Sequence, residues 1–225
     1  MFKFKKSRTV FVIIMLSVIV LLNGCSAGGG VENTENYSFD ANNKTLTIHS
    51  NSYFDSDYEK FTGSDSSYVL ENVVIDDGVT NIGNFAFSSC ESLENITIPN
   101  SVKEIGIGAF SNCKNLESLT IPDGVKKINF LTFSGCENLT SVTIPNGVTT
   151  IEVSAFDDCT NIKSITIPNS VIYIYGRTKS LNMGPSPFNG WTEEQTIYVQ
   201  GRSTVPDTWD EDWTYGCKAK IVWNA

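Results

Sequence analysis

The sequence predicts a repeat solenoid, in which the chain winds through stacked and nearly identical coils around one apolar interior. Three observations support this fold class. Cysteines recur 23 residues apart, at Cys90, Cys113, Cys136 and Cys159. A phenylalanine stands three positions before each of them, and the pattern Thr-Ile-Pro follows each at a constant distance. A period in the twenties is typical of one supersecondary unit per coil, which buries its apolar side chains only against its neighbours.

Each unit is expected to contain one short strand. In Ile96-Thr97-Ile98 apolar and polar side chains alternate, which indicates a half-buried strand, and Pro99 ends it because proline cannot donate a backbone hydrogen bond. The constant step superimposes the units, so the strands are predicted to form a short parallel sheet on one face. Three columns of like side chains would fill the interior: Ile98, Ile121, Ile144 and Ile167; Val102, Val125, Val148 and Val171; Phe87, Phe110, Phe133 and Phe156.

The second half of each unit is expected to form the opposite wall. Apolar residues recur there at spacings of three to four, as from Val102 to Phe110, which predicts turns and short helical segments. A unit without the proline precedes the four clear copies. Another begins at Phe188, nine residues later than the period requires, with Trp191 at the cysteine position. Six strand-bearing units are therefore predicted over residues 69–200.

Both ends of the solenoid should be capped, because a terminal unit has only one neighbour. Residues 37–68 are predicted to form the N-terminal cap, with a β-hairpin over 37–50 that turns at Asn42-Asn43 and a polar loop after it. Residues 201–225 are predicted to form a β-structured C-terminal cap, in which Trp209, Trp213, Tyr215 and Trp223 close the apolar interior.

Residues 1–24 have the features of an export signal. A cationic start precedes an apolar stretch of 14 residues, shorter than the roughly 20 needed to span a membrane. The stretch leads into Leu22-Asn23-Gly24-Cys25, which resembles a bacterial lipobox, so Cys25 is the predicted lipidation site. An ordinary secretory signal with a chance cysteine is the alternative. Residues 25–36 are glycine-rich and polar, as expected of a flexible tether. The protein is thus predicted to be exported and lipid-anchored at the bacterial cell surface.

The repeat, written C-x-x-L-x-x-(I/V/L)-T-I-P-x-(S/G)-V-x-x-I-x-x-x-A-F, resembles that of the BspA-like leucine-rich repeat family over about residues 69–200. The closing segment that begins G-W-T-E-E-Q-T-I-Y-V also resembles the end of such proteins. The resemblance implies a right-handed leucine-rich-repeat solenoid with a parallel sheet on its concave face. It also implies a cell-surface location and a role in adhesion or protein binding.

Residue types that support catalysis are few. The single histidine, His49, is expected to be a surface strand residue with no nucleophile beside it. No catalytic residue, metal site or cofactor is predicted, and the protein is not expected to be an enzyme. The four repeat cysteines are expected to be free, small buried hydrophobes, with disulfides between adjacent coils as the alternative. Cys217 is expected to be free and buried near the cap.

The net charge argues against a nucleic-acid partner. The whole chain carries −9, and without the four basic residues of the leader 12 basic face 25 acidic residues, which gives −13. Such an acidic surface repels a phosphate backbone.

The remaining candidates are surfaces. The outward strand positions form the candidate binding face: Asn95, Thr97, Ser118, Thr120, Ser141, Thr143, Ser164 and Thr166. They either provide a hydroxyl-lined platform for a protein or glycan, or only stabilise the sheet, as β-branched threonine does. Arg177 and Lys179, in the nine-residue insertion, form a candidate binding loop unless the insertion has no function.

The predicted function is therefore non-catalytic binding or adhesion at the cell surface. The partner would be an extracellular protein or glycan, or one carried by a host or neighbouring cell. A structural or self-assembling envelope protein and a cell-surface hydrolase are the alternatives.

Overall fold

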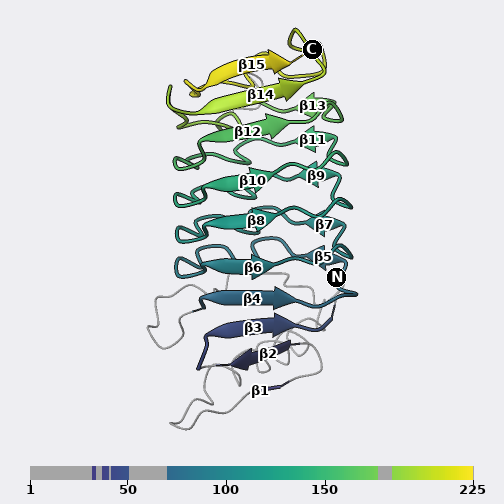
Figure 1. Cartoon of the computed structure of the whole chain (residues 1–225), viewed down its shortest axis with the longest axis vertical. Helices are drawn as coiled ribbons and strands as arrows, with labels where there is room; N and C mark the ends of the chain where they lie inside the picture. The colour runs from purple at the N-terminus through teal and green to yellow at the C-terminus, as the bar shows by residue number, and fades with distance from the viewer. Residues whose placement is uncertain (1–31, 34–36, 41, 51–69, 177–183, 225) are drawn as a thin grey trace, which may run out of the picture.

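The computed structural model describes residues 32–33, 37–40, 42–50, 70–176 and 184–224. These residues build an elongated stack of coils, with the hairpin of the N-terminal region at one end and the C-terminal strand at the other (Figure 1). One wall of the stack consists of the longer strands and the other of two-residue strands. The predicted leucine-rich-repeat solenoid is confirmed.

The longer strands run parallel in one wall and are joined by one coil each. Neighbouring strands are in register at the 23-residue step, so that Ser141 lies opposite Ser118 and Thr143 opposite Thr120. Hydrogen bonding divides the wall into two sheets. One has seven strands in the order β1-β2-β3-β4-β6-β8-β10, where β1 is Glu32–Asn33 and β2 is Tyr37–Asp40, and the other has three strands in the order β12-β14-β15. The parallel strands are β3 (Thr45–Ile48), β4 (Asn72–Ile75), β6 (Asn95–Thr97), β8 (Ser118–Thr120), β10 (Ser141–Thr143), β12 (Ser164–Ile167), β14 (Thr196–Gln200) and β15 (Lys220–Asn224).

The opposite wall contains turns and short parallel strands. Its strands are β5 (Asn81–Ile82), β7 (Glu104–Ile105), β9 (Lys127–Ile128), β11 (Thr150–Ile151) and β13 (Tyr173–Ile174).

The expected short helical segments are wrong for the described residues, which contain no helix. The physical reason is a column of positive φ angles near +55° at Phe85, Gly108, Leu131 and Ser154. A second such column follows four residues later, at Ser89, Asn112, Gly135 and Asp158. A residue in the left-handed region cannot continue a right-handed helix, so these two columns restrict the wall to turns.

The interior is continuous from coil to coil. Phe87, Phe110, Phe133, Phe156 and Phe188 are buried and lie over one another, with ring centroids 5.4–5.9 Å apart and interplanar angles of 3–16°. The isoleucine and valine columns are buried beside them, except that Ile98 is only half-buried. Phe188 keeps its place in the stack despite the insertion before it. The predicted column of superimposed phenylalanines is therefore correct and extends by one ring.

The repeat cysteines are buried free thiols, as predicted, and they also donate hydrogen bonds. Each phenylalanine carbonyl accepts the amide hydrogen of the cysteine in its own coil. In three coils it also accepts the thiol of the next coil: Cys113 to Phe87, Cys136 to Phe110 and Cys159 to Phe133, at 3.0–3.1 Å.

Trp191 takes over the role of the thiol in the following coil. Its indole Nε1 donates to the Phe156 carbonyl at 2.9 Å, so the position requires a buried donor as well as an apolar group. The description of these positions as purely hydrophobic is therefore incomplete.

The N-terminal hairpin forms with β2 (Tyr37–Asp40) antiparallel to β3, and β3 then starts the parallel sheet against β4. The turn passes through Asn42 and Asn43, as the sequence predicts. Strand β1 (Glu32–Asn33) pairs with β2, although these two residues fall within the expected flexible tether. The remainder of that tether, the leader and the polar loop after the hairpin lie outside the described residues.

The C-terminal end is closed by aromatic side chains. Trp209 and Trp213 are buried, with centroids 5.0 Å apart in an edge-to-face arrangement, and Trp213 meets the Phe188 ring edge-on at 6.2 Å. The guanidinium of Arg202 lies 5.7 Å from the Trp209 ring centroid, where it makes a cation–π contact. The last phenylalanine of the stack is thereby shielded from water. The expectation that Tyr215 also closes the interior is wrong, because Tyr215 is 49% exposed.

Candidate binding face

The eight predicted binding-face residues are all exposed, and they lie in two columns on β6, β8, β10 and β12. The residues between them, Leu119, Val142 and Ile165, point into the core and are buried. Successive side chains of a β-strand point to opposite faces of the sheet, and here one face is buried and the other faces solvent. The eight side chains therefore lie on one surface. We call this surface the strand face.

Both columns continue beyond the predicted residues. Asn95 Nδ2 donates to Asn72 Oδ1 at 3.0 Å, which adds Asn72 to the first column. In the second column Val74 lies beside Thr97, and Tyr198 lies beside Thr166. Both added residues are exposed apolar side chains. The face therefore offers hydroxyl and amide groups over its middle, with an apolar residue at each end.

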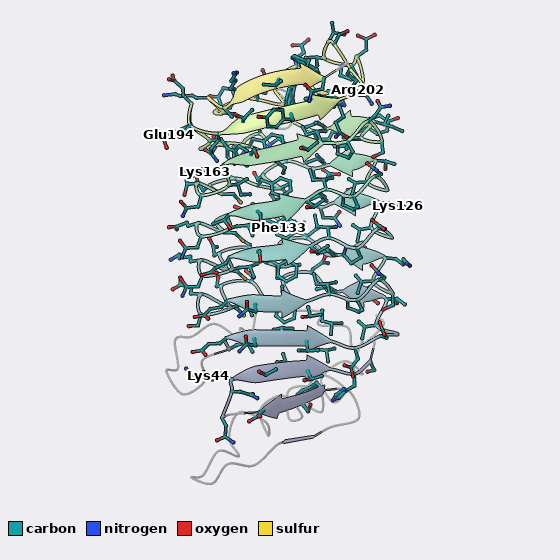
Figure 2. The ribbon with its side chains drawn as sticks, in the orientation of Figure 1. Lys44, Lys126, Phe133, Lys163, Glu194 and Arg202 are labelled. Atoms are coloured by element: carbon teal, nitrogen blue, oxygen red, sulfur yellow. The ribbon has the colours of Figure 1, made fainter. Side chains whose placement is uncertain are left out.

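The flank of the strand face differs from coil to coil. Glu94, Glu117, Thr140 and Lys163 hold the position before the strands and are exposed. Figure 2 shows Lys163 and Glu194 on the side where the longer strands begin, and Lys126 on the far side, next to the short strand β9 of the opposite wall. The charge beside the strand face therefore changes from negative at Glu94 and Glu117 to positive at Lys163. Such a change in charge along a surface favours one orientation of a charged partner.

A second exposed surface lies on the opposite wall, near the C-terminal end. Tyr173 and Tyr175 stack with ring centroids 6.2 Å apart and an interplanar angle of 10°, and Ile172 is exposed beside them. Sequence reasoning missed this surface. Its signal is the run Ile-Tyr-Ile-Tyr, because the buried Ile174 forces both of its neighbours outward.

His49 has partners that the sequence did not reveal. Its Nε2 lies 3.0 Å from Ser38 Oγ, and its Nδ1 lies 2.6 Å from Asp76 Oδ2. The expectation that no nucleophile lies beside His49 is therefore wrong. The contact depends on hairpin register and on strand pairing across 27 residues, which no local motif indicates.

The buried thiols are poor nucleophiles. Burial raises the pKa of Cys90 and Cys136 to about 12, and it also raises the pKa of Cys113 and Cys159 well above the usual range. All five described cysteines are free, so the alternative of disulfides between coils is not realised. Cys217 is half-buried rather than buried.

Several predicted features cannot be placed. Cys25, Arg177 and Lys179 lie outside the described residues. Within the described ranges no helix is long and apolar enough to cross a membrane. Nor do three or more His, Cys, Asp or Glu side chains of the described part gather into a possible metal site.

Comparison with known proteins gave the following likenesses. The family model for the BspA type leucine rich repeat region matches residues 65–178 in six copies, just over half of the chain. A leucine-rich repeat protein from Bacteroides ovatus is 28% identical, with a TM-score of 0.52, over 81% of this chain and 43% of that one. The pneumococcal vaccine antigen PcpA is 22% identical, with a TM-score of 0.51, over 88% of this chain and 48% of PcpA.

The chain thus spans less than half the length of either of these two proteins, and the likeness to PcpA concerns the fold alone. No curated protein sequence matches significantly.

Proposed function

The chain belongs to the BspA-type leucine-rich repeat family, and from this premise we propose that it is a binding protein of the cell surface, whose binding face takes no part in catalysis. Its partner is an extracellular protein or glycan, or one carried by a host or neighbouring cell. The observation that carries the proposal is the strand face, whose eight predicted residues are all exposed on one regular surface.

The strand face suits binding because it is already ordered. Its backbone is held by the parallel ladder, and its underside is fixed by buried residues such as Leu119, Val142 and Ile165. A partner would therefore bind without first ordering a loop, which is a cost that reduces affinity in flexible sites. Hydroxyl and amide groups both donate and accept hydrogen bonds, so they suit the peptide groups of a protein or the hydroxyl groups of a glycan.

The N-terminal segment of the chain supports a surface location. We propose that residues 1–24 direct export, that Cys25 receives the lipid, and that the tether over 25–36 joins the membrane to the caps and repeats. A lipid anchor with more than one acyl chain holds a protein stably at a membrane. The charge of −13 left without the leader is unfavourable for nucleic acid and suits a dispersed, self-repelling surface protein.

The test is a binding screen with the purified full chain in detergent against extracellular matrix proteins and surface glycans. Thr120→Arg with Thr143→Arg would place two long cations in the middle of the strand face. We expect affinity to fall by about tenfold or more, equivalent to about 1.4 kcal/mol, because the partner would lose its close approach. Thr150→Arg, at the outward position of β11 on the opposite wall, is the matched control.

Two results would contradict the proposal. One is the absence of any partner at micromolar concentration. The other is a partner whose affinity falls equally with Thr150→Arg and with the double variant. Far-UV circular dichroism of all three proteins shows whether the fold is kept.

A further inference from the structure

We propose that Ser38, His49 and Asp76 form a nucleophile site that reacts with carboxylic esters. The site lies at the N-terminal end of the solenoid, where the hairpin joins the first parallel strand. It is independent of the partner-binding function proposed above, because it shares no residue with the eight predicted residues of the strand face.

Backbone pairing brings the three side chains together. Ser38 lies in β2 opposite Thr47 of β3, and residues opposite each other in an antiparallel pair point to the same side of the sheet. His49 follows β3 directly and Asp76 follows β4, whose ends meet where Ile48 lies beside Ile75. The Asp76 amide donates to the Ile48 carbonyl at 2.9 Å and continues this pairing. Sites built on paired strands hold their geometry better than sites on loops.

The order of hydrogen bonds follows from the chemistry of the groups. An ionised carboxylate only accepts, so at the 2.6 Å contact with Asp76 Oδ2 the proton lies on His49 Nδ1. In the neutral ring Nε2 then carries the lone pair and accepts the Ser38 hydroxyl hydrogen across 3.0 Å. This is the arrangement in which an imidazole acts as the base for a serine and a carboxylate holds its tautomer.

The exposure of the site lets a substrate approach it directly from the solvent. The His49 and Asp76 side chains are 36% and 44% exposed, and Ser38 is half-buried. A reacting ester therefore need not enter a deep pocket, and it can be carried by a larger molecule that lies along the sheet.

The reaction would proceed in two stages, acylation of Ser38 and hydrolysis of the acyl group. Ser38 Oγ forms a bond to the ester carbonyl carbon while its proton moves to His49 Nε2. The bond from that carbon to the leaving oxygen then breaks, and the leaving alcohol takes the proton from Nε2. Water next attacks the acyl group on Ser38, gives one proton to Nε2, and releases the carboxylic acid as Ser38 Oγ takes that proton back.

Turnover is expected to be slow. General base catalysis by a positioned imidazole contributes about 10²–10⁴-fold, and here it acts in contact with water. Covalent capture is therefore a sharper readout than product release. A fluorophosphonate probe forms a phosphorus–oxygen bond with an activated serine and expels fluoride, while the serine proton leaves through the imidazole.

The experiment treats the full chain with a fluorophosphonate probe and follows the rate of labelling and the labelled peptide by mass spectrometry. We expect label on Ser38 and none in Ser38→Ala. Asp76→Asn should slow labelling by about tenfold or more, because an amide can hold the ring in the wrong tautomer. Ser203→Ala is the matched control, since Ser203 is an exposed serine outside the strand face and the chain's only histidine is His49.

A second measurement separates base catalysis from a folding effect. His49→Gly should abolish labelling, and added imidazole should restore it by occupying the space of the lost ring. Hydrolysis of p-nitrophenyl acetate should follow the same order among the variants. Equal labelling of Ser38→Ala and the unaltered chain would overturn the proposal. So would labelling of the unaltered chain no faster than that of the urea-unfolded chain. Either failure leaves the strand-face experiment unaffected.

Discussion

Replacement of Phe133 by alanine tests whether the coils share one interior. The ring is fully buried and stacks on Phe110 at 5.7 Å and on Phe156 at 5.4 Å. A buried Phe→Ala change costs about 3–5 kcal/mol in lost burial and cavity formation. With a urea m-value of about 1–3 kcal/mol/M, the unfolding midpoint should fall by at least about 1 M. Phe85→Ala is the control, because the Phe85 ring is exposed and its loss should change stability little.

The positions of the tryptophans make the assay specific. All four of them lie after residue 190, so their fluorescence reports the C-terminal end, while far-UV circular dichroism reports every coil. A continuous core predicts that Phe133→Ala shifts both unfolding transitions together. A fluorescence midpoint that stayed unchanged while the circular dichroism midpoint fell would refute the continuous core, because the C-terminal coils would then unfold independently of the centre.

Three further changes have expected outcomes. Stability to urea should fall above pH 9, because burial raises the pKa of Cys90 and Cys136 to about 12 and unfolding lets both thiols ionise. The free energy of unfolding should fall by about 1.4 kcal/mol for each of these thiols at pH 10. In Cys136→Ala the pH-dependent decrease should be smaller by the contribution of one thiol. Gly135→Ala should cost about 1–2 kcal/mol by thermal unfolding, since φ is +72° and the new methyl would lie 2.3 Å from Asn112 Oδ1; an unchanged midpoint would contradict this. Gln195→Leu should lower the free energy of unfolding by about 1–3 kcal/mol for each buried group that loses its hydrogen bond. The buried Gln195 amide accepts from Thr192 N and donates to the carbonyls of Cys159 and Ile162. An unchanged free energy of unfolding would contradict this, because it would mean that water replaces the amide.

Periodicity predicted the interior and the strand face because both depend on the 23-residue step alone. Superposition of identical units is enough to place Phe133 over Phe110 and Thr143 beside Thr120. The prediction for the opposite wall is wrong in part, since apolar spacings of three to four also arise when two residues per coil, such as Leu131 and Gly135, adopt a positive φ.

Two features depended on information that the repeat does not contain. The Ser38–His49–Asp76 contacts require the hairpin register and the pairing of β3 with β4, which bring side chains from three segments together. The thiol hydrogen bonds depend on how neighbouring coils stack, because a thiol such as that of Cys136 donates to a carbonyl of the preceding coil. In retrospect Trp191 at the cysteine position is a signal, because the two side chains have in common a polarised hydrogen that they can donate.

Three phenylalanine carbonyls each accept two hydrogen bonds, one from their own coil and one from the next coil. This has a consequence for how the number of repeats in the protein can change during evolution. The coils of Phe87, Phe110 and Phe133 each present the same ring and the same carbonyl to the next coil, and each carbonyl accepts a thiol hydrogen from that coil. Even the extra residues ahead of Phe188 leave its ring 5.9 Å from that of Phe156. Recombination that adds or removes one whole repeat therefore joins surfaces that already fit, and the reach of the molecule can evolve without any redesign of its interior.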